Sequence, residues 1–433
     1  MEYFEINKNN IIKYIEEGEK EKKDLTIGIE IEHIIVNKDS LRSITYDEEK
    51  GVEYILEQLL QYGWEKSNVG ENILSLEKND DNITLEPGAQ IEVSLKNCNS
   101  IQEIDDRYIS FAKDIFPILE KNNYCLLCLG YHPVTKIKEI PFIPKERYKY
   151  MSNYLQSKGN LALNMMKGTA SLQVAVDYTD NIDYRKKFRV ANFLSPVISL
   201  LFDNTPVFEG ELWEGNIARV NVWNNVDNDR CRIIPDVLDS EFEYEDYATY
   251  MLNKPSVISL IDGEFVYTEE KLIKEIYDEI EMTEEQIIHL LTMFFPDVRT
   301  KKYIEIRMAD SVPYPYSIAA ASLWKGILYD NKNLEYFYNL SKEYSNNTVE
   351  DIKKRLISNE KEVFQEVSEL IDLVLKKSQS GLMEEEKKYL QPLIDLKQSD
   401  INLSNKMKKK LKKGEYKEIN MHALNLNILR REK

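Results

Sequence analysis

Two glutamates interrupt an apolar run near the start of the chain. Residues 26–33 read TIGIEIEH, which is typical of a buried strand except for Glu30 and Glu32. Side chains at positions i and i+2 of a strand lie on the same face, roughly 7 Å apart. The two carboxylates therefore share one face, and this face is either solvated or covered by a positive partner.

Three further segments, 90–95, 170–177 and 303–308, combine an apolar face with a face of carboxylate, amide or guanidinium groups. Their polar positions are Gln90, Glu92 and Ser94, then Ser171, Gln173 and Asp177, then Tyr303, Glu305 and Arg307. Neighbouring carboxylates raise one another's pKa unless cations neutralise them. Oxygen ligands suit Mg²⁺ or Mn²⁺. Alternation alone leaves two alternatives open, a solvated face of an antiparallel sheet and a metal-binding sheet.

The composition excludes several classes of protein. With 42% hydrophobic residues, the 433-residue chain can bury a large core, and its net charge of −18 argues against general affinity for nucleic acid or anionic membranes. The most apolar stretch, residues 193–202, is much shorter than the roughly 20 residues of a spanning helix.

Cys125 and Cys128 lie in an apparent buried strand, so we assign them to packing. We expect a soluble, cytoplasmic protein.

The order of the elements predicts an α+β protein. Ser100 and Glu103 have capping-box spacing, which predicts that a helix begins there. After about residue 331 the chain has helical, highly charged segments without strand patterns. We therefore expect a catalytic domain over residues 1–330 and a helical portion over 331–433 that packs on the same domain. The basic run at 406–414 is interpreted as a solvated helix end, with an acidic partner or a nucleotide as the alternative.

Several segments resemble, in the same order, those of glutamate–cysteine ligases of the plant and proteobacterial type. LEPGAQIEVS at 85–94 is similar to the family's LEPGGQFELS segment, and GIEIEH at 28–33 to its G-x-E-x-E strand. The other similar segments include IPKERYKYMSNYL, MMKGTASLQVAVDY, ARVNVWNNVDNDRC, FEYEDYATYMLNKP and FFPDVRTKKYIEIRMAD. The resemblance extends from about residue 25 to about residue 330, and the matches are specific as a set.

The resemblance implies an antiparallel β-sheet funnel with packed helices, of the glutamine-synthetase or carboxylate–amine-ligase type. It also implies a reaction in which ATP phosphorylates the γ-carboxylate of glutamate. The amine of cysteine then displaces phosphate and forms γ-glutamylcysteine, the first step of glutathione biosynthesis. Such phosphoryl transfer depends on charge neutralisation and positioning more than on a protein acid or base. The expected partners are small molecules, and we expect a monomer or homodimer.

The same resemblance assigns roles to individual residues. The implied ligands of Mg²⁺ or Mn²⁺ are Glu30, Glu32, Glu86, Glu92, Gln173 and Glu305. Arg307 and Arg219 are the implied catalytic cations, and Arg219 also belongs with Trp223 and Tyr247 to the substrate pocket. Lys301 and Lys302 are assigned to the ATP phosphates, with ordinary surface charges as the alternative.

The sequence departs from the family pattern near the substrate pocket. Ala89 replaces a glycine, Ala175 replaces an amide, and three glycines are absent after Arg307. These changes leave a second hypothesis open, a related ligase that joins glutamate or a similar carboxylate to a different amine. A non-catalytic relative is the third hypothesis. The retained carboxylates argue against it, because unpaired buried charge is costly.

Overall fold

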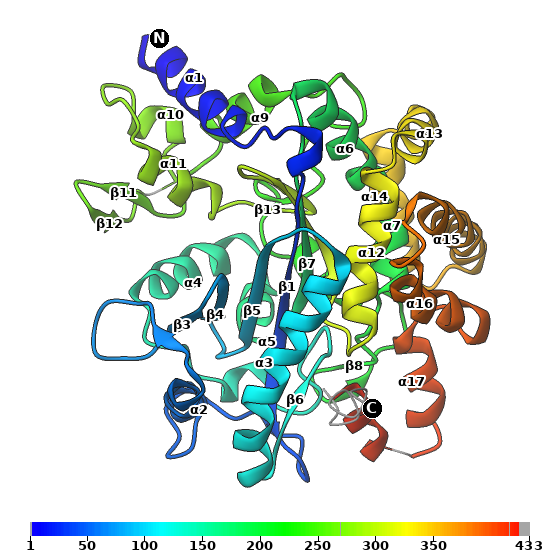
Figure 1. Ribbon diagram of the computed structural model, residues 1–433. Helices are drawn as coiled ribbons and strands as arrows, with labels where there is room; N and C mark the ends of the chain where they lie inside the picture. The colour runs from blue at the N-terminus through cyan, green and yellow to red at the C-terminus, as the bar shows by residue number, and fades with distance from the viewer. Residues whose placement is uncertain (1, 269, 415, 424–433) are drawn as a thin grey trace.

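The computed structural model describes residues 2–268, 270–414 and 416–423. Its centre is a sheet in which every strand pair is antiparallel and the order is β14-β15-β7-β1-β5-β4-β3-β2, with β6 paired to the far end of β1 (Figure 1). The strands are β1 (Ile27–Asn37), β2 (Glu65–Lys66), β3 (Ser75–Lys78), β4 (Asp81–Leu85), β5 (Ile91–Cys98), β6 (Tyr124–Leu127), β7 (Ser171–Val176), β14 (Val298–Thr300) and β15 (Ile304–Asp310). The predicted α+β class with an antiparallel sheet is confirmed.

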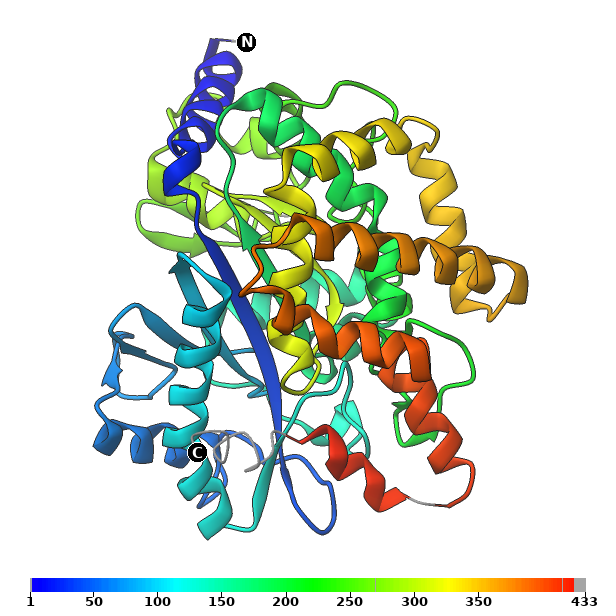
Figure 2. The same cartoon turned by 45° about the vertical axis from the view of Figure 1, so that its right-hand side comes forward.

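Helices cover the apolar face of this sheet. α3 (Ile101–Lys121) packs on β1 and β5, and α12 (Tyr316–Leu328) packs on β1 and β7 (Figure 2). α3 begins where the sequence predicts, because the Ser100 side chain accepts a hydrogen bond from the Glu103 N–H. The reciprocal bond is displaced by one residue, since the Glu103 carboxylate accepts from Asn99. The face thus covered is the apolar one in the sequence pattern.

The opposite face of the sheet is lined by shorter helices. These are α4 (Glu146–Lys158), α5 (Ala162–Gly168) and α8 (Ala218–Asn224). Two consecutive helices, α6 (Asn181–Phe193) and α7 (Ser195–Leu201), follow β7. The division lies at Leu194, beside Pro196, which lacks the N–H that a continuous helix requires.

The carboxyl-terminal helices pack against the preceding part of the chain. They are α13 (Asn331–Ser341), α14 (Asn346–Ile357), α15 (Lys361–Gly381), α16 (Lys387–Ser399) and α17 (Leu403–Leu411), followed by a 3₁₀ segment over Tyr416–His422. α15 and α16 contact α12, so they extend the helical layer on the same side of the sheet (Figure 2). The described elements of 331–433 are helical, and residues 415 and 424–433 lie outside the described residues.

The remaining elements lie outside the central sheet (Figure 1). They are α1 (Glu2–Glu16), α2 (Val52–Leu59), α9 (Tyr244–Leu252), α10 (Ile273–Ile276) and α11 (Glu284–Leu291), with the strand pairs β8–β9 (Val207–Phe208, Glu211–Leu212), β10–β13 (Cys231–Arg232, Phe295–Pro296) and β11–β12 (Ser259–Ile261, Glu264–Val266). In the described ranges, no helix has the length and apolarity needed to cross a bilayer. All four cysteines are described, buried and free.

Candidate active site

A turn fixed by several hydrogen bonds places Glu86 over the polar face of the sheet. The turn joins β4 to β5 and is closed by a hydrogen bond from the Glu86 N–H to the carbonyl of Gln90, 3.0 Å long. The Gln90 side chain fixes it further, because its oxygen accepts from the Gly88 N–H and its nitrogen donates to the carbonyl of Thr169. A Cβ on Gly88 would lie 2.5 Å from the carbonyl oxygen of Lys167, so only glycine fits.

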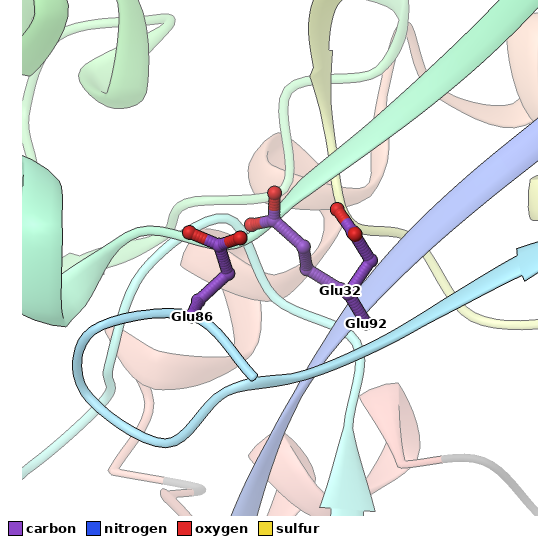
Figure 3. A group of neighbouring side chains, drawn as sticks. All are labelled: Glu32, Glu86 and Glu92. Carbon is purple, nitrogen blue, oxygen red and sulfur yellow. The ribbon is translucent and has the colours of Figure 1, made fainter. Parts of the chain in front are cut away.

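Glu32, Glu86 and Glu92 form a cluster of three carboxylates. Glu32 of β1 lies directly opposite Glu92 of β5 in the antiparallel register. One carboxylate oxygen from each of the three residues lies within 4.8 Å of the other two. Figure 3 shows the three side chains turned toward one another, two from neighbouring strands and one from the turn.

Burial and mutual repulsion disfavour the charged forms of this cluster. Burial, followed by the charge of Glu86, raises the pKa of Glu32 to about 7. Burial and the charges of Glu30, Glu86 and Glu32 raise the pKa of Glu92 well above its ordinary value. Hydrogen bonds compensate in part: Ser171 donates its N–H and hydroxyl to Glu32, at 2.7 and 2.6 Å. A bound cation would relieve the remaining repulsion.

A second group of charges surrounds Glu305, whose side chain is 1% exposed. Its carboxylate contacts the nitrogens of Arg299, Lys301 and Arg307 at 2.6, 2.6 and 2.7 Å. Burial alone would raise the pKa of Glu305, but these three cations hold it well below the ordinary value. Arg307 also donates to the side-chain oxygen of Gln173, so one guanidinium links Glu305 to the strand beside the carboxylate cluster.

The wall that faces the sheet carries unused hydrogen-bond donors. Arg219 and Trp223 lie one helical turn apart on α8, and Arg147 lies in the first turn of α4. The Nε of each arginine and the indole Nε1 of Trp223 are buried, and none has a hydrogen-bond acceptor within the described part of the chain. Such donors are costly unless an acceptor arrives. A ligand that carries carboxylate or phosphate oxygens would supply these acceptors.

Apart from Glu305, these groups line one cavity of about 380 Å³ between the sheet, α4 and α8. Carboxylate oxygens on one side suit a hard divalent cation. Guanidinium, ammonium and indole N–H groups on the other side suit an anionic ligand. The cavity therefore has the charge pattern needed to hold a divalent cation together with an anionic substrate.

Comparison with known proteins identifies the family. The model of glutamate–cysteine ligase family 2 (GCS2) matches residues 26–418. The chain belongs to the glutamate–cysteine ligase family 2. The match extends well beyond residue 330, so the carboxyl-terminal helices through α17 are part of the family's own region.

Named relatives of this family member include plant enzymes. The chain is 29% identical over 396 residues to glutamate–cysteine ligase B, chloroplastic, of Oryza sativa subsp. japonica, covering 87% of this chain and 78% of the relative. It is 30% identical over 356 residues to the chloroplastic glutamate–cysteine ligase of Nicotiana tabacum, covering 78% and 66%.

A solved structure has the same fold as this family member. The glutamate–cysteine ligase of Francisella tularensis in complex with AMP aligns with a TM-score of 0.58 over 94% of this chain and 88% of that chain. The sequence identity is 12%, so this likeness supports the fold alone.

Most residues that the family resemblance singled out lie together in the cavity of this glutamate–cysteine ligase family member. The lining includes Glu30, Glu32, Glu86, Glu92, Gln173, Arg219, Trp223, Lys301 and Arg307. Glu30 is partly buried and pairs across the sheet with Gln173 and Ser94. The predicted sharing of one polar face by the strands is confirmed.

The predicted site residues Lys302 and Tyr247 do not line the cavity. Lys302 pairs with Glu17 and Glu284 outside the cavity, because the side chains of Lys301 and Lys302 diverge at the β14–β15 turn. Tyr247 is fully buried and accepts a hydrogen bond from the Thr300 N–H, so it supports β14.

Glu305 and Gln173 differ from the implied metal ligands in their partners. The Glu305 carboxylate is occupied by its three cations. The amide oxygen of Gln173 accepts from Arg307, and its nitrogen faces Glu32 and Glu92 at 3.4 and 3.5 Å. In this arrangement Gln173 connects the carboxylate cluster to Arg307.

Sequence reasoning missed Arg147 and Arg299. Arg299 lies opposite Glu305 in the β14–β15 register and bonds it at 2.6 Å. β14 has only three residues, too few for alternation to be visible. Arg147 stands in a helix whose resemblance to the family was recognised, and its buried, unpartnered Nε is apparent only in the structure.

Proposed function

We propose that this protein is an ATP-dependent glutamate–cysteine ligase, which joins the γ-carboxylate of L-glutamate to the amine of L-cysteine. The observation that carries the proposal is the pairing, in one cavity, of the Glu32–Glu86–Glu92 cluster with the unpartnered donors of Arg147, Arg219 and Trp223. Membership of the family and the names of its relatives point to the same reaction.

Glu32, Glu86 and Glu92 are the residues that would hold Mg²⁺ or Mn²⁺. Three carboxylates within 4.8 Å of one another fit a hard divalent ion, and the raised pKa values of Glu32 and Glu92 reflect burial and mutual repulsion that a cation would relieve. When bound, the ion would supply neutralisation of negative charge on the ATP phosphates. Glu30 also lines this cavity, and its carboxylate adds negative charge beside the three glutamates.

The cations of the cavity are placed to stabilise the transferring phosphoryl group. Arg307 and Lys301 line the cavity and are held by Glu305. In the proposed first step, a γ-carboxylate oxygen of glutamate attacks the γ-phosphorus of ATP, the bond to the bridging oxygen breaks, and ADP leaves. Fixed guanidinium and ammonium groups favour the oxygens on which charge develops.

The donors of α4 and α8 would orient the amino-acid substrate. Arg219 donates to the carbonyl of Arg307 at 3.0 Å and pairs with Asp310 at 4.0 Å, and its buried Nε has no acceptor within the described residues. In the second step the amine nitrogen of cysteine attacks the acyl carbon of γ-glutamyl phosphate. Phosphate leaves, the amine loses a proton, and an amide forms. Orientation of the acyl phosphate favours this attack over hydrolysis.

The decisive experiment measures ADP and γ-glutamyl product with purified protein, Mg-ATP and glutamate. Turnover that requires cysteine and yields γ-glutamylcysteine supports the proposal. Turnover only with another amine from a panel supports the related ligase, and the absence of both ATP binding and turnover contradicts both. A place at the first step of glutathione synthesis and a cytoplasmic location stay predictions, as does a monomeric or homodimeric state.

A further inference from the structure

A second cavity carries four lysines in its lining, in a chain of net charge −18. It has a volume of about 550 Å³ and lies among α16, α17 and the loop that precedes α8. Figure 1 shows α16 on the right-hand side, with α17 below it. Its charged lining residues are Lys397, Lys408, Lys409, Lys412, Glu214 and Asp400. Asp372 pairs with Lys397 at 2.9 Å, so four lysines face three carboxylates and the cavity keeps a small positive excess. Three of the four lysines come from the 406–414 run.

The lysines of the cavity differ in how firmly they are held. Lys408 is only 8% exposed, and its ammonium group donates to the carbonyl of Gly215 at 2.6 Å. Lys409 and Lys412 reach Asp400 and Glu214 at 2.5 and 3.3 Å, with side chains 70% and 57% exposed. Exposed ion pairs contribute little to stability. The two outer lysines can therefore exchange these carboxylates for a bound anion at small cost.

The wall of this cavity continues directly into the active site. Residues 214–217 lead into α8, where Arg219 stands in the second position. The segment is anchored tightly: Ile217 has a left-handed backbone with φ 45°, and its N–H donates to the buried Asp203 carboxylate at 2.9 Å. A Cβ on Gly215 would lie 2.2 Å from the carbonyl of Ile357. Because Lys408 holds the Gly215 carbonyl, the cavity and Arg219 share one short, rigid segment.

We propose that this cavity is a second ligand site, which binds a small polyanion bearing phosphate or carboxylate groups, and that the bound anion is coupled to the substrate cavity through residues 214–219. Lys408, Lys409 and Lys412 supply the ammonium groups, and the apolar side of the cavity is formed by Phe364 and Ile401. Its volume of about 550 Å³ suits a small molecule. An anion that attracts the Lys408 ammonium group weakens its hydrogen bond to the Gly215 carbonyl. This change alters the position of residues 214–219, which include Arg219.

The first test is a calorimetric titration of the full-length protein with inorganic pyrophosphate in EDTA, to exclude metal-bridged binding. A double variant, K409Q/K412Q, should weaken this binding about tenfold or more, since two charge-assisted contacts are lost. The matched control, K361Q/K376Q, removes two exposed lysines of α15 and should bind like the wild type. A parallel titration with tricarballylate distinguishes a phosphate from a carboxylate ligand. The R307Q variant removes a cation of the substrate cavity, so it distinguishes pyrophosphate bound there from pyrophosphate bound in the second cavity.

The second test measures coupling by hydrogen exchange. Pyrophosphate should slow amide exchange over residues 214–224 in the wild type and in K361Q/K376Q, and leave it unchanged in K409Q/K412Q. Unchanged thermal unfolding of the variants shows that they fold. Equal affinity in all three proteins, absence of binding by both probes, or exchange that is unaffected in the wild type would overturn the proposal. None of these readouts depends on turnover, so the result is independent of the ligase reaction.

Discussion

Glu32 and Glu92 lie directly opposite each other on paired antiparallel strands. Like charges in this position destabilise a sheet. Thr84 donates to Glu92 at 2.8 Å and Ser171 to Glu32 at 2.6 Å, so each carboxylate is held in place by a neighbouring strand. The sheet thus holds two mutually repelling carboxylates close together, and a cation bound between them would offset this repulsion.

Removing one charge from this pair should abolish cation binding without unfolding the protein. E32Q and E92Q keep the side-chain size, and each should lower Mn²⁺ affinity and turnover by roughly 100-fold or more. Mn²⁺ binding is measured by electron paramagnetic resonance, and folding by circular dichroism. E77Q, at an exposed position on β3, is the matched control and should behave like the wild type. Wild-type Mn²⁺ affinity in both E32Q and E92Q would contradict the assigned site.

The stability of the metal-free protein should fall as pH rises. Because burial and Glu86 raise the pKa of Glu32 from 4.5 to about 7, the folded state retains a proton that the unfolded state releases. The corresponding stability is present below about pH 4.5 and is lost by about pH 7, roughly 3 kcal/mol in total. Urea unfolding in EDTA across this range measures it. The slope should flatten in E32Q, and added Mg²⁺ should restore stability at pH 8. Parallel profiles for E32Q and wild type would refute this account.

Arg307 should matter more for turnover than for folding. R307Q removes the guanidinium that joins Glu305 to Gln173, but Glu305 keeps Arg299 and Lys301 at 2.6 Å each. We expect roughly 100-fold lower kcat and a loss of about 1–3 kcal/mol in the free energy of unfolding. R307K keeps the charge but not the planar fork, and should recover stability better than kcat. R355Q, whose guanidinium pairs with Glu360 at the surface, is the control. Full activity in R307Q would contradict the role.

Trp223 and Trp64 allow an indole N–H that would bind substrate to be compared with one that stabilises the fold. The indole N–H of Trp223 has no acceptor within the described residues, whereas that of Trp64 donates to Asp114 at 3.0 Å. W223F should raise the KM for glutamate roughly tenfold with little loss of stability. W64F should lower the free energy of unfolding by about 1–3 kcal/mol and leave KM unchanged. Steady-state kinetics and urea unfolding test the pair, and a W223F variant with wild-type KM would exclude the proposed contact.

The turn that carries Glu86 should be stabilised by glycine at position 89. Ala89 has φ 68°, a left-handed conformation in which a Cβ is strained. Replacing it with glycine should raise the free energy of unfolding by up to about 1 kcal/mol, since the strain relieved exceeds the added chain entropy. A112G within α3 is the contrasting control and should destabilise. Urea unfolding distinguishes the two signs, and destabilisation by A89G would mean that the left-handed strain is negligible.

Alternation in the sequence predicted the faces of the four main strands, because which way a side chain points on a strand is a local property. Glu30, Glu32, Glu92 and Gln173 all lie on the predicted polar face. Alternation says nothing about Glu86, which stands in a turn. Its assignment came only from the family resemblance, and the structure brings it to the cluster.

Pairing between distant segments could not be predicted from the sequence. The partners of Glu305 depend on the β14–β15 register, and Arg299 belongs to a strand too short to show a pattern. Lys301 and Lys302 are adjacent and equally charged, so only the geometry of the turn distinguishes the one that lines the cavity. Tyr247 illustrates the same limit, since an aromatic side chain in a pocket segment can equally support the neighbouring strand.

The order of strands in the sheet has a consequence for biosynthesis. β1 is made first among the nine strands, yet its neighbours β5 and β7 end at residues 98 and 176, and β15, which completes the cluster around Glu305, ends at residue 310. While the ribosome is still translating the middle of the chain, β1 presents an apolar face with unpaired backbone groups on its edges. Such an intermediate is prone to aggregate. Slow translation or chaperone capture between residues 98 and 310 should therefore govern how much of this protein reaches its native state.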